Sequence, residues 1–398
     1  TGTSSSGATP AAASCAFSRS TTTSAPTCGV EALMIVTCEH QDTPVWRIRL
    51  GPGAAGRTSL DPAGVADLHA LLEQADEGEK AINVILSSKE THDDITPVRL
   101  DKNGITAFIS IMRGCENYCA DCVVPFTRGR ERSRDPRSII KEARELVKKG
   151  YREVTLLGQN VNSYYWEENG KETKFYELLE KVADVDPLLR VRFATSHPKD
   201  ISDELLKTIG SHKNICNSIH LPVQSGSNDI LKLMNRKYTR EWYLDRISAI
   251  RKYIPGCTIS TDIIAGFCTE SDQDHGDTIS IMKEVGYDYA FMFKYSERPD
   301  TIAQKKLEDD VPDEVKSTRL QEIIDLQQQL SHKSNKQDIG NTFEVLVEGF
   351  SKKSDEHLMG RNSQNKVVVF PKESYSTGDY VQVKVNDCTP ATLLGSAI

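Results

Sequence analysis

Three cysteines stand close together in the sequence at a spacing that can hold a metal centre. Cys115, Cys119 and Cys122 form the pattern C-x3-C-x2-C. Thiolates are soft ligands that suit zinc and iron–sulfur clusters, and three of them in one short segment would converge on one centre. The same segment carries charged residues such as Arg113 and Asp121, which make a poor apolar core. A metal centre is therefore favoured over three cysteines that are merely buried.

A structural zinc site is the main alternative to an iron–sulfur cluster. Structural zinc takes four ligands, commonly as two close pairs. The next cysteine in the chain is Cys216, and no histidine lies between Cys122 and His197. A cluster held by three cysteines needs no fourth protein ligand and leaves one iron open to bind another molecule. The spacing therefore favours an iron–sulfur cluster with an open iron.

The elements that must position these cysteines alternate between β-rich runs and amphipathic helical stretches. Predicted strands cover residues 105–111, 153–157, 191–195, 218–221, 258–264 and 289–294. Predicted helices cover residues 136–149, 175–182, 203–209, 229–234, 240–253 and 277–285. Six strands with right-handed helical crossovers indicate an open or partial barrel, whose working groups follow the carboxyl ends of the strands. The cysteine segment follows the first of these strands.

The segments on either side of this region differ in character. Residues 311–335 are predicted to form one long helix, and the following runs 343–348, 366–370 and 380–385 alternate like strands of a small all-β barrel. Residues 1–30 are rich in Ser, Thr and Ala and are predicted to be poorly ordered. Two possible strands follow at 32–37 and 45–50.

Composition narrows the class of protein. The 398 residues are 38% hydrophobic and 27% charged, and no run approaches the roughly 18 apolar residues of a membrane helix. We find no export signal, so a reducing compartment, the cytoplasm, is expected. The net charge of −8 argues against a protein that is basic all over, although a local basic strip can still bind nucleic acid.

The cysteine segment and its surroundings resemble the radical S-adenosylmethionine (SAM) enzymes, and among them the methylthiotransferase family. The resemblance includes the run from Gly114 to Gly129 and the following Arg132-Ser-Arg134. Further matching stretches are Leu156–Val161, Thr195–Pro198, His220–Ser227, Met234–Thr239, Thr261–Phe267 and Phe291–Ser296. The stretch Gly360–Phe370 resembles the TRAM domain with which this family holds tRNA. The resemblance extends from about residue 66 to the end of the chain.

The resemblance implies an α/β fold with a partial (β/α)6 TIM-like radical SAM barrel and a small C-terminal TRAM-like β-barrel. The expected domains are an atypical low-complexity region (1–65), a linker or remnant of the family's N-terminal domain (66–100), the radical SAM barrel (101–330) and the TRAM-like barrel (331–398).

The implied activity is that of a tRNA methylthiotransferase. It adds a methylthio group to C2 of N6-isopentenyladenosine beside the anticodon, and uses one SAM for the methyl group and another for a 5′-deoxyadenosyl radical. Cys115, Cys119 and Cys122 would ligate the cluster, whose open iron binds SAM. The residues expected to line the cofactor and substrate pocket are Gln159, Asn160, Ser196, Gln224 and Ser225. Capping of strand ends would equally account for such polar residues.

An arginine-rich segment follows the cysteines. Arg128, Arg130, Arg132 and Arg134 are expected to contact phosphates of the anticodon stem–loop, since arginine suits phosphate geometry. The alternative is an ordinary solvated face. An electron-donor protein is the other implied partner, and the chain is expected to be a monomer without membrane contact.

Two departures from the family pattern affect these expectations. The family's N-terminal domain binds a second [4Fe–4S] cluster through three cysteines, whereas Cys15, Cys28 and Cys38 lie in Ser/Thr-rich or unpatterned surroundings. Without that cluster the chain would cleave SAM and not insert sulfur. The second departure is Cys268-Thr269, where most relatives have Pro-Gly, and it is expected to change the shape of the loop.

Other functions stay open at this point. A methylthiotransferase could act on threonylcarbamoyladenosine in tRNA or on a ribosomal protein. A relative that is inactive in sulfur transfer could still bind RNA through the arginine segment and the β module.

Overall fold

The computed structural model describes residues 33–36, 46–49, 104–352 and 354–398. The chain divides into two compact units, Thr1–Ala55 and Gly56–Ile398. In the first unit, β1 (Leu33–Val36) pairs with β2 (Trp46–Arg49) in an antiparallel manner, which confirms the two strands expected there. The predictions for residues 1–30, for Cys15, Cys28 and Cys38 and for the linker 66–100 lie outside the described residues.

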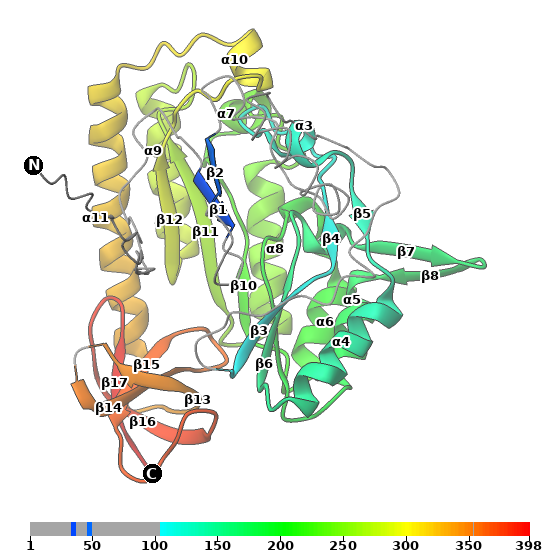
Figure 1. The fold of residues 1–398 in the computed structure, drawn as a ribbon. Helices are drawn as coiled ribbons and strands as arrows, with labels where there is room; N and C mark the ends of the chain where they lie inside the picture. The colour runs from blue at the N-terminus through cyan, green and yellow to red at the C-terminus, as the bar shows by residue number, and fades with distance from the viewer. Residues whose placement is uncertain (1–32, 37–45, 50–103, 353) are drawn as a thin grey trace, which may run out of the picture. The chain divides into compact units, whose positions relative to one another are not determined.

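Two parallel sheets, each of three strands, form the centre of the second unit (Figure 1). The strands are β3 (Thr106–Ser110), β6 (Glu153–Leu157), β9 (Arg190–Phe193), β10 (Ser218–His220), β11 (Thr258–Ala265) and β12 (Tyr289–Lys294). The sheet orders are β3-β6-β9 and β10-β11-β12. A parallel bridge between Val191 in β9 and Ile215, just before β10, links the two sheets. The predicted partial barrel is thus confirmed.

Helices follow the strands and bury one face of each sheet. The longer ones are α4 (Pro136–Lys148), α5 (Phe175–Ala183), α6 (Asp203–Ser211), α7 (Asn228–Leu233), α8 (Arg240–Tyr253) and α9 (Asp272–Val285). Along β11, Ile259 and Ile263 are buried in the core, while Ser260 and Asp262 on the opposite face are half-buried. Strand alternation therefore separates an apolar face that packs on helices from a more polar one.

Helix α9 begins five residues earlier than its predicted start at residue 277. Ser271 accepts a hydrogen bond from the amide of Asp274, and the Asp274 carboxylate accepts one from the amide of Ser271. This capping box satisfies amide groups of the first helical turn. It allows a helix to start in a polar segment that also contains Gly276.

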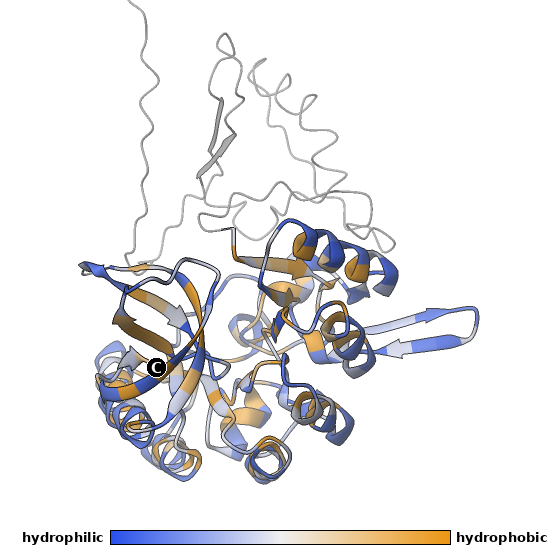
Figure 2. Cartoon of the chain, turned by 90° about the horizontal axis from the view of Figure 1, so that it is seen from below, coloured by the Kyte–Doolittle hydropathy of each residue, from blue (hydrophilic) through white to orange (hydrophobic). Residues whose placement is uncertain are grey.

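Several short elements escaped prediction because two to five residues carry no readable periodicity. They are the strand pairs β4 (Met112–Arg113) with β5 (Arg132–Ser133) and β7 (Tyr165–Glu168) with β8 (Lys171–Lys174), the helices α3 (Val124–Arg128) and α10 (Ile302–Lys306), and the 3-10 turns η1 (Val161–Ser163) and η2 (Pro198–Asp200). The β7–β8 hairpin is the hydrophilic projection in Figure 2.

The long helix α11 (Asp313–Gln337) leads into a closed five-stranded barrel. Its strands are β13 (Thr342–Ser351), β14 (Ser354–Arg361), β15 (Val367–Pro371), β16 (Tyr380–Cys388) and β17 (Leu393–Ala397). Buried residues such as Val345, Phe370 and Val383 fill it. The all-β barrel was predicted, but β14 and β17 were not, because their polar alternation is weak.

The C-terminal barrel is joined to the amino ends of the parallel strands. Arg190, the first residue of β9, donates to the carbonyl oxygen of Arg361 over 2.7 Å. Arg192 donates to that of Asn362 over 2.7 Å and pairs with Glu153 over 2.9 Å. Because these are the amino ends, the opposite ends of the strands stay available for a site.

None of the helices in the described ranges has the length and apolar character required to cross a membrane.

Candidate functional site

The predicted site residues lie on loops that follow the carboxyl ends of successive parallel strands. The cysteines follow β3, Gln159 follows β6, Ser196 follows β9 and Gln224 follows β10. The ends of α7 and α10 reach the cysteine loop, because Ala120 donates its amide to the carbonyl oxygen of Met234 over 2.9 Å and Ala303 donates to that of Ala120 over 2.8 Å. Figure 1 shows α3, α7 and α10 gathered at this end of the sheets. Such an edge is the usual place for a site in a parallel α/β fold.

The cysteine loop is closed at its base by the short β4–β5 pair. Just after β4, the amide of Cys115 donates to the carbonyl oxygen of Gly129 over 3.2 Å. Gly114 has a φ of 77°, and a Cβ there would stand 1.9 Å from the carbonyl oxygen of Arg130. Only glycine allows the two chain segments to come this close. The loop is therefore anchored before its first cysteine.

A small apolar cluster supports the middle of the loop. Ala120, between two of the cysteines, is buried together with Met234, Phe267, Tyr295 and other residues from the ends of α7, β11, β12 and α10. Tyr118 has a φ of 50°, a left-handed conformation that non-glycine residues rarely adopt. Strained backbone of this kind persists where surrounding contacts hold it, and it is common at functional sites.

Burial raises the pKa of all three thiols. For Cys119, whose side chain is the most buried of the three, the pKa rises to about 11. Charge repulsion from neighbouring thiolates adds to the increase for Cys115 and Cys119. The thiols are thus near enough to sense one another, and a metal centre must displace their protons to bind.

The three thiols fit a cluster better than a single ion. Among the described residues, no three His, Cys, Asp or Glu side chains form a group that could hold one metal ion. A structural zinc site takes four ligands that all reach the same atom. A [4Fe–4S] cluster distributes its cysteines over different irons, so its ligands are spread more widely. Three free, mutually interacting thiols on one loop are a suitable donor set for it.

The loops after β6 and β9 contain several buried polar atoms without hydrogen-bond partners among the described residues, and two of them belong to predicted site residues. The Oε1 atom of Gln159 and the Oγ atom of Ser196 are buried and have no hydrogen-bond partner among the described residues. Buried polar atoms are rarely left unpaired in a finished site. Both are therefore candidates for contact with a bound molecule.

Asn160 instead joins the two loops to each other. Its Nδ2 atom donates to the Asp200 carboxylate over 2.7 Å, and its Oδ1 atom accepts from the amide of His197 over 3.2 Å. Asn160 is buried and its amide group is used within the fold. Its direct role is to hold the loops on which Gln159 and Ser196 lie.

Gln224 and Ser225 are positioned by β11 and α9. Gln224 has a φ of 67°, donates its amide to the carbonyl oxygen of Asp262 and accepts a bond from the amide of Ile264. The Ser225 hydroxyl accepts a bond from the amide of Ser227 and lies 3.4 Å from the Thr278 hydroxyl. The backbone of Gln224 is thus fixed, and the Ser225 hydroxyl is engaged with neighbouring protein groups.

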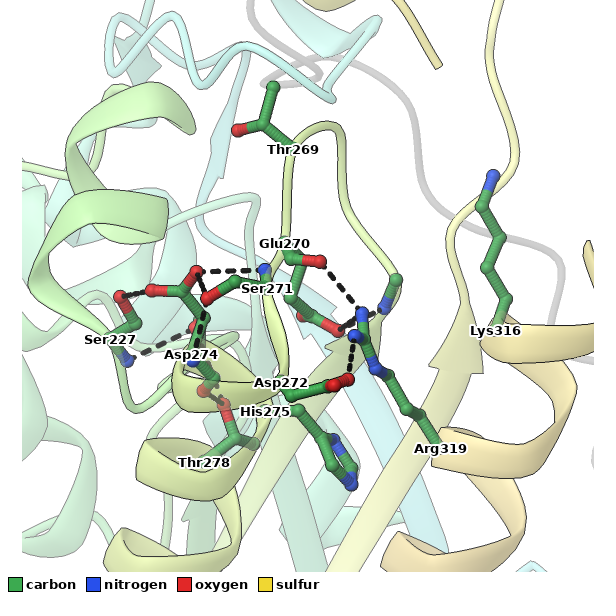
Figure 3. Close-up of polar contacts among 12 residues, drawn as sticks. Ser227, Thr269, Glu270, Ser271, Asp272, Asp274, His275, Thr278, Lys316 and Arg319 are labelled. Carbon is green, nitrogen blue, oxygen red and sulfur yellow. Dashed lines mark hydrogen bonds and ion pairs between the residues drawn. The ribbon is translucent and has the colours of Figure 1, made fainter. Parts of the chain in front are cut away.

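The loop after β11 is braced by helix α11 (Figure 3). The Glu270 carboxylate accepts a bond from the amide of Gly266 over 2.9 Å and pairs with Arg319 over 3.1 Å. Burial raises the pKa of Glu270, while the charge of Arg319 opposes the increase. Thr269 lies at the tip of this loop with a φ of 63°. Cys268 is buried in the apolar cluster under the cysteine loop.

The structure divides the predicted arginine strip. Arg128 and Arg130 are exposed, and Arg132 is half-buried. Arg134 is buried: its guanidinium pairs with Glu142 over 2.6 Å and donates to the Ser138 hydroxyl. The expectation that Arg134 contacts phosphate is therefore wrong, because its donors are already used inside the fold.

One residue near the cysteines was missed in the sequence analysis. Arg236 follows α7, and its Nη1 atom lies 3.2 Å from the Sγ atom of Cys119. The stretch Met234–Thr239 resembles the methylthiotransferase family, but the resemblance assigns no role to Arg236. The sequence feature that could have identified Arg236 is an arginine within this family-matching run between two predicted helices.

Two family models match the chain. That of the Radical SAM superfamily matches residues 109–282, which include the three cysteines, and that of the TRAM domain matches residues 336–398. Radical SAM enzymes use a [4Fe–4S] cluster and SAM, so membership implies both cofactors. Among solved structures, coproporphyrinogen III oxidase (HemN) from Escherichia coli aligns over 70% of this chain and 66% of its own, with a TM-score of 0.43 and 15% identity.

Curated tRNA-2-methylthio-N(6)-dimethylallyladenosine synthases are similar to most of the chain. The protein from Parabacteroides distasonis is 57% identical over 339 residues, which cover 85% of this chain and 74% of the relative. The protein from Amoebophilus asiaticus is 57% identical over 346 residues (84% and 71%), and that from Christiangramia forsetii 54% identical over 353 residues (85% and 73%). With this similarity, and with a radical SAM barrel joined to a TRAM domain, the chain belongs to the radical SAM methylthiotransferase family of tRNA-2-methylthio-N(6)-dimethylallyladenosine synthases.

Proposed function

We propose that this chain adds a methylthio group to C2 of N6-isopentenyladenosine in tRNA. The observation that carries the proposal is the placement of Cys115, Cys119 and Cys122 on one anchored loop at the carboxyl edge of the parallel strands. The similarity to enzymes named for this reaction supports the choice of substrate. The TRAM domain at the other end of the same unit supports RNA as the substrate class.

In this proposal, the three cysteines hold a [4Fe–4S] cluster and leave one iron for SAM. When bound, the cluster supplies the electron that cleaves SAM, and this chemistry belongs to the cofactor. The residues of the chain orient the reactants. Gln159 and Ser196 would offer their unpaired oxygen atoms to bound cofactor or substrate, and Asn160 would keep the two loops in register.

The loop after β10 would complete the pocket. The backbone of Gln224 is held between two residues of β11, so its side chain starts from a fixed position next to the proposed site. Ser225 would support the pocket indirectly, because its hydroxyl accepts a bond from the amide of Ser227 before α7 and lies next to Thr278 in α9.

Three arginines beside the cysteine loop, two of them exposed and one half-buried, would contact tRNA. Arg128, Arg130 and Arg132 would bind phosphates of the anticodon stem–loop. A target base splayed out of a single-stranded loop could then enter the site. Arg130 lies 3.6 Å from Glu116 at an exposed position, and such a pair is weak enough to exchange for a phosphate.

Three further parts of the proposal concern the surroundings of the enzyme. An electron-donor protein would reduce the cluster, the chain would act as a monomer, and it would work in the cytoplasm.

A second [4Fe–4S] cluster on Cys15, Cys28 and Cys38 would supply sulfur if those cysteines can converge. Iron and sulfide analysis tests this: about four of each per chain indicates one cluster, and about eight indicates two.

The decisive experiment is mass spectrometry of tRNA nucleosides. The chain is expressed in a bacterial strain that lacks its own methylthiotransferase and accumulates N6-isopentenyladenosine. Appearance of the 2-methylthio derivative supports the proposal. Unchanged N6-isopentenyladenosine contradicts it, and modified threonylcarbamoyladenosine would identify a different target. With reconstituted protein, absence of 5′-deoxyadenosine would leave only an RNA-binding role.

A further inference from the structure

Arg236 connects the segment after α7 to the cysteine loop. Its Nη1 atom lies 3.2 Å from the Sγ atom of Cys119, and its Nη2 atom donates to the Asp121 carboxylate over 3.1 Å. The next residue toward the N-terminus, Asn235, donates its side-chain amide to the carbonyl oxygen of Tyr118 over 2.7 Å. One short segment thus contacts the loop on both sides of Cys119.

The guanidinium of Arg236 is a permanent charge in a poorly solvated place. Its side chain is only 9% exposed, and that of Asp121 is 15% exposed. Arginine keeps its proton under all ordinary conditions, and its planar fork lets it bond to two groups in a fixed geometry. Asp121 therefore sets the orientation in which the guanidinium meets the sulfur of Cys119.

Arg236 also has a donor left over. Its Nε–H group is buried and has no hydrogen-bond partner among the described residues. Leaving such a group unpaired costs free energy, so unpaired donors mark places where a bound group completes the bonding. The side chain thus offers one donor to a cysteine sulfur and keeps a further buried N–H group without a partner among the described residues.

We infer that Arg236 positions Cys119 and raises the reduction potential of the iron–sulfur cluster. This inference rests on the proposed role of Cys119 as a cluster ligand. A hydrogen bond to a ligand sulfur withdraws negative charge from the cluster, and a nearby positive charge favours the reduced state, which carries one more electron. Arg236 acts through Cys119, so it is a positioning residue and not a catalytic one.

Because Asp121 carries the opposite charge to Arg236, replacing each residue should shift the reduction potential of the cluster in opposite directions. Arg236→Met removes the positive charge and all the guanidinium N–H donors, so the cluster becomes harder to reduce. Asp121→Asn removes the negative charge and keeps the arginine, so the cluster becomes easier to reduce. Mere damage to the loop would move the potential in the same direction in both variants.

A matched arginine provides the control. Arg240 lies near the start of α8, its side chain is 18% exposed, and it pairs with Glu284 over 3.0 Å. It also donates to the carbonyl oxygen of Asp277 over 2.7 Å. Arg240→Met therefore removes an arginine of similar burial that has no contact with the cysteine loop.

The experiment compares the four proteins after anaerobic reconstitution with iron and sulfide. Iron content and far-UV circular dichroism are measured first. Each loaded protein is then titrated with dithionite, which delivers one electron per cluster, and the reduced cluster is followed by electron paramagnetic resonance. We expect the midpoint potential to be more negative in Arg236→Met, less negative in Asp121→Asn and unchanged in Arg240→Met.

The outcomes separately test the positioning role of Arg236, its effect on the reduction potential and the proposed ligand set. A folded Arg236→Met protein that takes up less iron than the wild type supports the positioning role. Equal iron uptake with a wild-type potential in both Arg236→Met and Asp121→Asn overturns the inference and leaves the proposed function intact. If the wild-type protein itself takes up no iron, the proposed ligand set is wrong, and the inference falls with it.

Discussion

At the scale of single residues, the three cysteines differ in their surroundings. Cys119 is buried and touches Arg236, whereas Cys115 and Cys122 are half-buried. A cluster that keeps only two cysteine ligands has a second iron without a protein ligand and is held at two corners only. Removal of any one of the three should therefore abolish the chemistry, and Cys119 is the most informative because solvent cannot easily replace it.

We predict that Cys119→Ala abolishes 5′-deoxyadenosine formation and changes tRNA affinity by less than about twofold, since phosphate contacts supply most of that affinity. Product analysis by liquid chromatography and a filter-binding assay measure the two quantities. Cys257→Ala, which removes a half-buried thiol far along the chain, is the control and should retain both. A parallel loss of product and tRNA affinity would contradict the separation of the two roles.

His197 gives a second prediction at this scale, one about pH. Its pKa is lowered to about 3, first by burial and then by the positive charges of Arg236, Lys199 and Lys237. The unfolded chain takes up this proton near pH 6.5, so the unfolded state binds more protons between the two values. Stability due to this group is complete above about pH 6.5 and is lost as the pH falls toward 3.

We expect His197→Gln to flatten this pH dependence. The difference in unfolding free energy between wild type and variant should change by at most about 1.4 kcal/mol per pH unit below pH 6.5. Urea unfolding at several pH values from 4.5 to 7.5 measures the difference on this scale. Two curves that remain parallel throughout would show that His197 is not the titrating group.

At the scale of elements, the loop between β11 and α9 combines strong bracing with a strained tip. Glu270 and Arg319 connect the loop to α11, and the capping box of Ser271 and Asp274 starts α9 (Figure 3). Thr269 comes immediately before these anchors in the chain and has a φ of 63°. A left-handed conformation costs an ordinary residue about 1–2 kcal/mol. Glycine avoids this cost because it has no Cβ atom.

We predict that Thr269→Gly stabilises the protein by about 0.5–1 kcal/mol, since relief of this strain exceeds the extra chain entropy of glycine in the unfolded state. The amide of Thr269, which donates to Asp310 over 2.7 Å, is kept. The midpoint of urea unfolding is the measurement. Thr269→Ala is the control and should gain less, because it retains a Cβ at positive φ. A lower midpoint in the glycine variant would refute the argument.

At the scale of the whole second unit, buried charges join the TRAM barrel to the radical SAM barrel. Arg192 and Glu153 are both less than 10% exposed and form an ion pair at the amino ends of the strands. Arg192 also donates to the carbonyl oxygens of Asn362 and Ser363, in the turn between β14 and β15. This turn lies in the stretch expected to resemble an RNA-binding domain, and here it serves to join the two barrels.

Removal of Arg192 should destabilise the protein more than removal of the whole ion pair. Arg192→Met leaves the Glu153 carboxylate buried and unpaired, which costs about 3–5 kcal/mol. The double variant Arg192→Met/Glu153→Leu should recover a large part of that loss in thermal unfolding. Both variants lack the bonds to residues 362 and 363, so both should be cleaved faster between the barrels by a protease. Equal cleavage of wild type and double variant would contradict the joining role.

Features that depend on neighbouring residues in the chain could be predicted from the sequence, whereas features that depend on contacts between distant residues could not. The sequence by itself determined the order of the six parallel strands and their main helices, three strands of the small barrel and the cysteine loop after the first parallel strand. Periodicity and capping are local properties, as at Ser202, whose side chain accepts a bond from the amide of Leu205 and caps α6. The sequence also pointed to the chemistry of the site, because three thiols in one loop are brought together by covalent connection alone.

Only the tertiary structure decided which polar residues face the site. Arg128 and Arg134 look alike in the sequence, yet one is exposed and the other is paired with Glu142 inside the fold. Arg236 is separated from Cys119 by 117 positions, and no local pattern could show their contact. Such pairs depend on how the helices pack on the sheets, and the packing is determined by apolar burial over the whole unit.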